Sequence, residues 1–257
     1  HTHAVARHEE VTMRSTQRFA AAAATAGLVG LLFLTPAAAA QGGYEAGKGS
    51  WTVRGFGAWL DTSGEPLVFR SIDPFPPVGE STFTLGDGEG IGLCLEYRIT
   101  RRFGVEALGL TADLEGEYRS TFIDPPIPEQ VVTQDVETEI YGLGLNLHLM
   151  PGRRIDVYLG PILAFVEYGE FRAPVVTGEA TTGTAFIESS DDTALGATLG
   201  ADLFLGSSGR WALSGAVRQL WSRFRKDSFF EIETDPLIAT AGVAYRFGGV
   251  LEERGRP

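Results

Sequence analysis

Hydrophobic and polar residues alternate strictly in several segments of this chain. In residues 90–99, the odd positions carry Ile, Leu, Leu, Tyr and Ile, whereas the even positions carry Gly, Gly, Cys, Glu and Arg. A similar separation recurs in residues 141–149 and 195–205. Successive side chains of a β-strand point to opposite faces, so a period of two indicates strands with one apolar face.

Five further segments show the same alternation less strictly, and together they raise the number of expected strands to eight. They are residues 51–60, 103–112, 156–168, 211–224 and 237–247. Pro161 lies inside one of them, although proline has no N–H for a sheet ladder and is usually tolerated only at an edge or a bulge.

The connections between these segments alternate between short and long. Residues 100–102, 150–155 and 206–209 are short turns, whereas residues 62–89, 113–136, 169–192 and 225–235 are long and hold most of the acidic residues. After Gln41 no apolar run is long enough for a membrane-spanning helix, but a spanning strand needs only about 9–11 residues. The pattern predicts an all-β, transmembrane antiparallel up-and-down β-barrel of eight strands, with short periplasmic turns and long external loops.

The second face of these strands carries Gly, Ala and single charges of both signs. We expect this face to line a narrow lumen in which the charges pair, because a lone buried charge is costly. The candidate polar network is Arg54, Glu96, Arg98, Glu106, Asp202, Arg218 and Arg246, with Asn146 and Asp156 on the same face. Aromatic residues near the strand ends of the apolar face are typical of membrane interfaces; they are Trp51, Trp59, Tyr97, Tyr141, Trp211, Tyr245 and Phe247.

The first forty residues are predicted to contain a targeting segment rather than part of the folded domain. Residues 13–40 contain two arginines, an apolar Ala-rich run and a small-residue end at Ala40, as a secretory signal peptide does; a short membrane anchor is the alternative. Residues 1–12 are interpreted as an upstream extension before Met13, residues 41–247 as the barrel and residues 248–257 as a periplasmic tail. Cleavage near Ala40 would deliver the chain to the outer membrane of a Gram-negative-type cell.

Composition narrows the function classes further. Of the 257 residues, 44% are hydrophobic, which excludes a disordered chain. The net charge of −12 argues against a nucleic-acid binder, because phosphate groups bind to concentrated positive charge. His148 is the only histidine after the signal peptide and has no serine motif beside it, so a lumen or interface hydrogen bond is a better interpretation than catalysis. We expect no enzyme activity, catalytic residue, cofactor or metal site, and we interpret Cys94 as a buried filler without a disulfide partner.

Several stretches of the chain are similar to one family of outer-membrane proteins. They are residues 50–55 (SWTVRG), 92–97 (GLCLEY), 103–108 (FGVEAL), 158–161 (YLGP) and 235–247, which end on Tyr-Arg-Phe. On these stretches the chain resembles the OmpW family of eight-stranded barrels over nearly all of residues 41–247. In that family the final aromatic strand is read by the barrel-assembly machinery and normally ends in Phe, whereas here residues 248–257 follow Phe247.

The resemblance implies passive passage of small hydrophobic molecules through a narrow lumen with a lateral exit. The residues that would line such a path are Phe56, Leu60, Leu108, Leu110, Ile162, Leu220 and Ile238. Simple filling of a barrel of this size is their alternative role. The implied partners are outer-membrane lipid, lipopolysaccharide, the barrel-assembly machinery and small hydrophobic solutes, with no nucleic acid.

Two other functions remain open at the level of sequence. A plugged barrel could display its acidic, proline-containing connections, such as residues 73–77 and 124–128, for adhesion or envelope integrity. A secreted lipocalin-like carrier is the third interpretation. The arrangement of the polar residues decides which route a solute could take. If they form a single network across the lumen, water and ions are blocked and only a lateral route through the wall is left.

Overall fold

The computed structural model describes residues 48–62, 66–70, 78–124, 127–177, 180–187, 189–206, 208–226 and 230–248. All of them belong to the compact unit Gly43–Pro257. The predicted extension 1–12, the signal peptide 13–40, the stretch 73–77 and the tail beyond Gly248 lie outside the described residues and stay predictions. Within the described part of the chain, no helix has the length and hydropathy needed to cross a bilayer.

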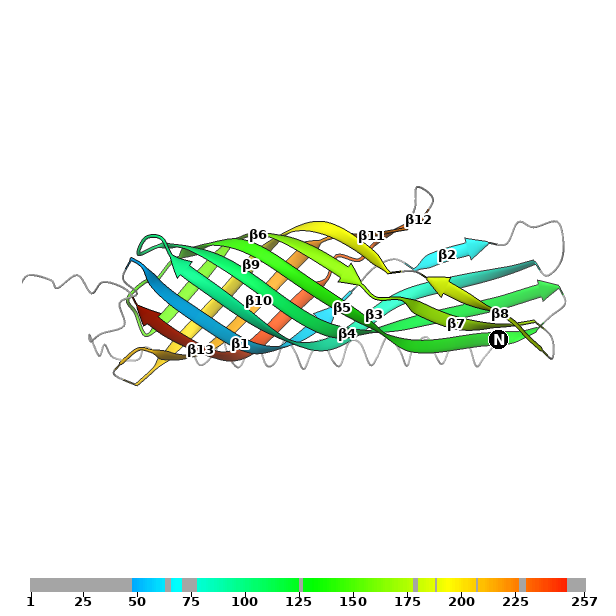
Figure 1. Ribbon diagram of the computed structural model, residues 1–257, viewed down its shortest axis with the longest axis horizontal. Helices are drawn as coiled ribbons and strands as arrows, with labels where there is room; N and C mark the ends of the chain where they lie inside the picture. Colours follow the sequence, from blue (N-terminus) through cyan, green and yellow to red (C-terminus); the bar gives the residue numbers. More distant parts are fainter. Residues whose placement is uncertain are drawn as a thin grey trace, which may run out of the picture. The chain divides into compact units, whose positions relative to one another are not determined.

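Eight antiparallel strands form a closed ring (Figure 1). They are β1 (Ser50–Asp61), β3 (Val78–Arg98), β4 (Phe103–Asp124), β5 (Ile127–His148), β6 (Ile155–Tyr168), β9 (Ser190–Leu205), β10 (Trp211–Trp221) and β13 (Leu237–Gly248). Each strand pairs with the next one of this series, and β1 pairs with both β13 and β3. The ring therefore has no open edge in its membrane-spanning part, and the predicted eight-stranded barrel is confirmed.

The long connections contain strands, which corrects the expectation that they are loops. They hold β2 (Leu67–Arg70), β7 (Phe171–Thr177), β8 (Ala180–Ile187), β11 (Arg223–Lys226) and β12 (Phe230–Glu233). The connection 113–136 is largely a continuation of β4 and β5, whose shared ladder runs from Phe103↔Leu147 to Phe122↔Ile127. In Figure 1 this hairpin projects far beyond the ring, on the side away from the short turns.

The apolar face of each strand points outward, as predicted. Leu93 and Leu195 are each 65% exposed, whereas their chain neighbours Cys94 and Ala194 are 1% and 0% exposed. Near the short-turn end, Trp51 packs on Tyr97 with ring centroids 4.7 Å apart, and Trp211 packs on Tyr245 at 4.8 Å. Such an apolar belt edged by aromatic rings is the surface that a lipid bilayer covers.

Carboxylates take over the outward positions beyond this belt, on the side of the long connections. Glu139, Glu167 and Asp191 lie opposite one another on β5, β6 and β9. Glu89, Asp113 and Glu137 do the same on β3, β4 and β5. We call these two sets the acidic rows. They mark the level at which the outer face of the wall changes from lipid-facing to water-facing.

The ladder between β5 and β6 is interrupted in the middle of the ring. Its pairs run from Thr138↔Tyr168 to Gly144↔Ile162 and resume at Leu147↔Leu159, without the pairs Leu145–Pro161 and Asn146–Gly160. Pro161 has no N–H to donate to the Leu145 carbonyl oxygen. That oxygen instead lies against Gly160, where an added Cβ would be 1.6 Å away, so only glycine fits at this position. The predicted irregularity at Pro161 is thus located at one seam of the wall.

Candidate functional site in the lumen

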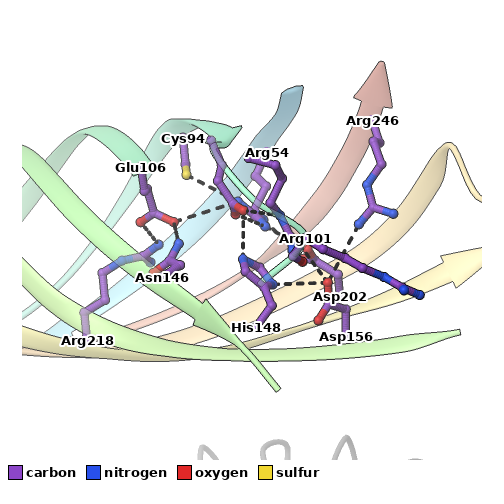
Figure 2. Close-up of polar contacts among 12 residues, drawn as sticks. Arg54, Cys94, Arg101, Glu106, Asn146, His148, Asp156, Asp202, Arg218 and Arg246 are labelled. Carbon is purple, nitrogen blue, oxygen red and sulfur yellow. Dashed lines mark hydrogen bonds and ion pairs between the residues drawn. The ribbon is translucent and has the colours of Figure 1, made fainter. Parts of the chain in front are cut away.

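The interior of the ring holds a set of buried charged and polar side chains that we call the polar lumen network. Its members are Arg54, Glu96, Arg98, Glu106, Asn146, His148, Asp156, Asp202, Arg218 and Arg246, each at most 7% exposed. Figure 2 shows side chains of this network reaching toward one another from different strands. The structure therefore brings together all seven residues predicted as a polar network.

Glu106 organises the part of the network that lies farthest from the short turns. Its Oε1 accepts a hydrogen bond from Arg218 Nη2 at 2.8 Å, and its Oε2 accepts one from Asn146 Nδ2 at 2.9 Å. Arg54 Nη1 lies 3.8 Å from the same carboxylate. Because Glu106 is on β4 and Arg218 is on β10, which are not neighbours in the ring, this pair spans the lumen.

Arg54 forms the centre of the network. Its Nε and Nη2 donate to the two carboxylate oxygens of Asp202 at 3.2 and 2.8 Å, and Nη2 also donates to Glu96 Oε2 at 2.7 Å. The guanidinium also lies 4.8 Å from the centroid of the Tyr158 ring. A guanidinium presents its N–H groups as a rigid fork, so this two-point contact fixes β1 against β9 across the lumen.

The part of the network nearest the short turns is built around Asp156. Arg98 Nη2 lies 2.7 Å from Asp156 Oδ2, and Arg98 Nε lies 2.6 Å from Glu96 Oε1. Arg246 Nη2 lies 3.9 Å from Asp156 Oδ2, while its guanidinium stacks 3.8 Å over the Phe204 ring. The arginines and carboxylates of seven strands, β1, β3, β4, β6, β9, β10 and β13, are thus linked into one continuous set (Figure 2).

His148 lies between two carboxylates of this set. Its Nε2 is 2.8 Å from Glu96 Oε1, and its Nδ1 is 3.1 Å from Asp156 Oδ2. The imidazole thus bridges a carboxylate of β3 and a carboxylate of β6. The structure places His148 in the lumen, one of the two positions expected from the sequence, and it has no hydroxyl nucleophile as a hydrogen-bond partner among the described contacts.

The arginines and carboxylates of the polar lumen network balance in charge. The network contains four arginines and the four carboxylates Glu96, Glu106, Asp156 and Asp202. Paired charges can stay buried, whereas a lone charge in such an interior would be strongly disfavoured. The arrangement can therefore close this half of the lumen to ions, because an ion in transit would have to displace paired groups.

The other half of the interior is apolar, and we call it the apolar lumen cluster. The seven predicted lining residues belong to it: Leu60, Leu108, Leu110, Ile162, Leu220 and Ile238 are buried, and Phe56 is partly buried against them. Leu108 is two residues beyond Glu106 on β4, and Leu220 is two residues beyond Arg218 on β10. The cluster therefore lies on the side of the network that faces the long connections.

Inward glycines make room for the large side chains of this interior. A Cβ added at Gly92 would lie 2.5 Å from the Phe56 ring, and one added at Gly142 would lie 2.8 Å from the Ile162 Cδ1 atom. Phe56 and Ile162 thus occupy space that any other residue at these glycines would fill. The cluster is a packed interior, and a solute could pass only where these side chains move.

Two further lumen residues were not predicted as site members. Tyr158 is fully buried beneath Arg54, and Phe204 is 1% exposed beneath Arg246. The alternation of the strands could have predicted both as lumen residues, because Tyr158 is two residues from Asp156 on the inward face of β6 and Phe204 is two residues from Asp202 on the inward face of β9. Cys94 is buried, as expected of a filler, with its Sγ 3.7 Å from Arg54 Nη1.

Comparison with known proteins identifies the architecture. No protein-family model and no curated protein matches the sequence. Among solved structures, the outer membrane protein OprG from Pseudomonas aeruginosa superposes with a TM-score of 0.60 at 16% identity, covering 81% of this chain and 99% of OprG. The chain has the fold of the OmpW-like outer-membrane β-barrels.

A second solved structure of this kind is the outer membrane protein AlkL in DMPC bilayers. Its TM-score is 0.47 at 19% identity, and the match covers 85% of this chain and 98% of AlkL. An OmpW-like barrel has its ends fixed by its fold, with short turns on the periplasmic side and longer connections outside. In this barrel the apolar lumen cluster lies toward the long connections and the polar lumen network toward the short turns.

Proposed function

We propose that this outer-membrane barrel lets small hydrophobic molecules pass from the extracellular side into the membrane without energy input. The observation that carries the proposal is the division of the lumen. An apolar solute entering from outside meets the apolar lumen cluster first and is then stopped by the polar lumen network. A lateral route through the wall is the one that avoids burying the solute against paired charges.

The seam between β5 and β6 is the place where we propose the lateral exit. Ile162 of the apolar lumen cluster is next to Pro161, and the ladder lacks two successive pairs there. Outward, the seam opens onto Leu145 and Leu163, which are 56% and 49% exposed on the apolar belt. Each backbone N–H or C=O group left unpaired in lipid costs several kcal/mol of free energy, as it does in an apolar solvent. Separating the strands at this seam breaks fewer backbone hydrogen bonds than separating them along a continuous ladder, so it costs less.

The proposal includes delivery and partners. The predicted signal peptide 13–40, cleaved near Ala40, would take the chain across the inner membrane, and the final strand ending at Phe247 would be read by the barrel-assembly machinery. Outer-membrane lipid and lipopolysaccharide would surround the apolar belt. Passage of a solute needs neither a catalytic residue nor a cofactor, so we assign no enzyme activity.

Uptake by reconstituted vesicles tests this function. We would place lipopolysaccharide in the outer leaflet, because its charged sugar layer slows apolar solutes, and measure the initial rate at which radiolabelled decane partitions into the vesicles. The protein should raise this rate, and Leu108→Arg with Leu110→Arg should return it to that of protein-free vesicles. Leu108→Met with Leu110→Met is the matched control, since these substitutions keep the volume and polarity of the cluster.

A plugged barrel that presents its extracellular strands to a partner is the second candidate. Two observations favour it: Leu60, Ile140 and Leu220 are 0% exposed in the packed lumen, and the β4–β5 hairpin extends well beyond the membrane. Decane uptake equal to that of protein-free vesicles, for a barrel shown to be folded, would reject passage and leave this candidate.

A further inference from the structure

Arg218 is the member of the polar lumen network that borders the apolar lumen cluster. It precedes Leu220 by two residues on the inward face of β10, and its guanidinium carbon is 5.9 Å from the centroid of the Phe56 ring. The side chain is 1% exposed. A solute that fills the apolar half of the lumen would therefore meet Arg218 as the first charged group.

The guanidinium of Arg218 has one N–H group to spare. Nη2 donates to Glu106 Oε1 at 2.8 Å, and Nη1 donates to Thr240 Oγ1 at a longer 3.4 Å. Nε is buried and has no hydrogen-bond partner among the described residues. A buried donor without an acceptor costs free energy, and in native proteins such groups are few and usually have a role.

The Nε groups of Arg54 and Arg98 both face carboxylates. The Nε of Arg54 donates to Asp202, whereas the Nε of Arg98 lies 2.6 Å from Glu96 Oε1 in an ion pair without hydrogen-bond geometry. These two arginines lie deeper in the polar lumen network and have carboxylates around them. Arg218 differs because one side of its guanidinium faces Glu106 and the other faces apolar side chains.

We infer that the apolar lumen cluster together with Arg218 forms a binding site for amphipathic molecules, with the chain of the ligand in the cluster and an oxygen acceptor of its head group on Arg218 Nε. This inference rests on the proposed function and deepens it by naming the class of solute. A neutral carbonyl or ether oxygen suits the site, because the Arg218 charge is already balanced by Glu106. A pure hydrocarbon of the same length gains no hydrogen bond there.

A direct test follows the Nε–H group itself. The barrel, labelled with ¹⁵N-arginine, is placed in lipid nanodiscs, and the NMR signal of Arg218 Nε–H is assigned by its loss in Arg218→Lys. We expect 2-decanone to shift this signal and decane to leave it in place. A signal that moves with both probes, or with neither, overturns the inference. The shift itself is measured on the unsubstituted protein, and the variant serves only to assign the signal.

A second test measures selectivity in the vesicle assay. Arg218→Lys keeps a positive charge opposite Glu106 but removes Nε–H. Thr240→Val is the matched control: it leaves Nε–H in place and removes the weak Nη1 contact together with the hydrogen bond from Thr240 Oγ1 to the Ala216 carbonyl oxygen. We expect the unsubstituted protein and the control to raise the uptake of 2-decanone about tenfold more than that of decane, the value of one good hydrogen bond to a charged group. Arg218→Lys should abolish this preference.

The two assays separate failure of this inference from failure of the proposed function. Uptake of both probes above protein-free vesicles without any preference for 2-decanone would leave passage standing and remove the head-group site. Uptake of neither probe, together with a shifted Arg218 signal, would keep the binding site and reject passage. Uptake of neither probe with an unshifted signal would reject both.

Discussion

At the scale of single residues, the lumen is held together by groups that cannot be removed one at a time. Glu106 is 1% exposed and accepts hydrogen bonds from Arg218 and Asn146. Deleting one partner of such a pair leaves the other as an uncompensated buried charge, which is far worse than losing the pair. The energetic role of each charge is therefore defined only together with its partner.

Glu106→Ala should destabilise the folded barrel by about 3–5 kcal/mol, because Arg218 would keep only its long contact to Thr240. Adding Arg218→Met should recover most of this loss. Urea unfolding of the barrel in lipid vesicles measures both changes. Glu89→Ala on an acidic row is the control and should stay within about 0.5 kcal/mol. A double variant less stable than Glu106→Ala would show that Arg218 is stabilised by groups other than Glu106.

Gly92→Ala and Gly109→Ala form a matched pair of glycine substitutions. At Gly92 the new methyl group would meet the Phe56 ring at 2.5 Å and the Gly109 carbonyl oxygen at 2.7 Å, whereas at Gly109 nothing lies within 4 Å. We expect Gly92→Ala to cost about 1–3 kcal/mol through overpacking and Gly109→Ala to be close to neutral. The same unfolding assay compares them, and equal costs would mean that Phe56 moves aside freely.

At the scale of elements, the apolar side of a strand changes where the strand leaves the membrane. On β4 the outward positions change to Asp113, Glu115 and Glu117, while the inward positions keep Leu114 and Tyr118. The sequence prediction ended this strand at residue 112 because it followed the outward apolar face. Beyond that point the alternation continues with the apolar residues on the inward face, which explains why the halves of β4 and β5 beyond the apolar belt were expected to be a loop.

Pro161→Ala tests the seam between β5 and β6. The substitution supplies an N–H group opposite the Leu145 carbonyl oxygen and should complete the ladder, with a stability change of about 1 kcal/mol or less. If solutes leave through this seam, decane uptake should fall severalfold, and the amide of residue 161 should be protected from hydrogen exchange. Pro236→Ala, outside this seam, is the control and should not alter uptake. Unchanged uptake in a protected Pro161→Ala barrel would locate the exit elsewhere.

At the scale of the whole molecule, the closed ring followed from sequence but the contacts inside it did not. The number of strands, their order and which face of each strand points outward could be predicted, because lipid outside and a narrow lumen inside enforce a period of two on every spanning strand. The pairing of Arg54 with Asp202, or of Glu106 with Arg218, could not. Every one of these residues has the same inward parity, and the curvature and register of the closed ring decide which of them meet.

A closed ring without an edge should resist detergent until heated. We expect the protein to leave membranes only with detergent and to migrate faster in SDS gels before boiling than after it, because the unheated barrel stays compact. Gel mobility with and without boiling checks this. Release by high salt alone would contradict a membrane-spanning ring.

The acidic rows also affect how several copies share one membrane. Two barrels that approached through β5, β6 and β9 would bring Glu139, Glu167 and Asp191 of one copy against the same carboxylates of the other. Like charges in water repel over about 10 Å at 0.1 M salt. The walls of neighbouring molecules should therefore keep their distance on this side, so that each seam between β5 and β6 opens onto lipid rather than onto another protein.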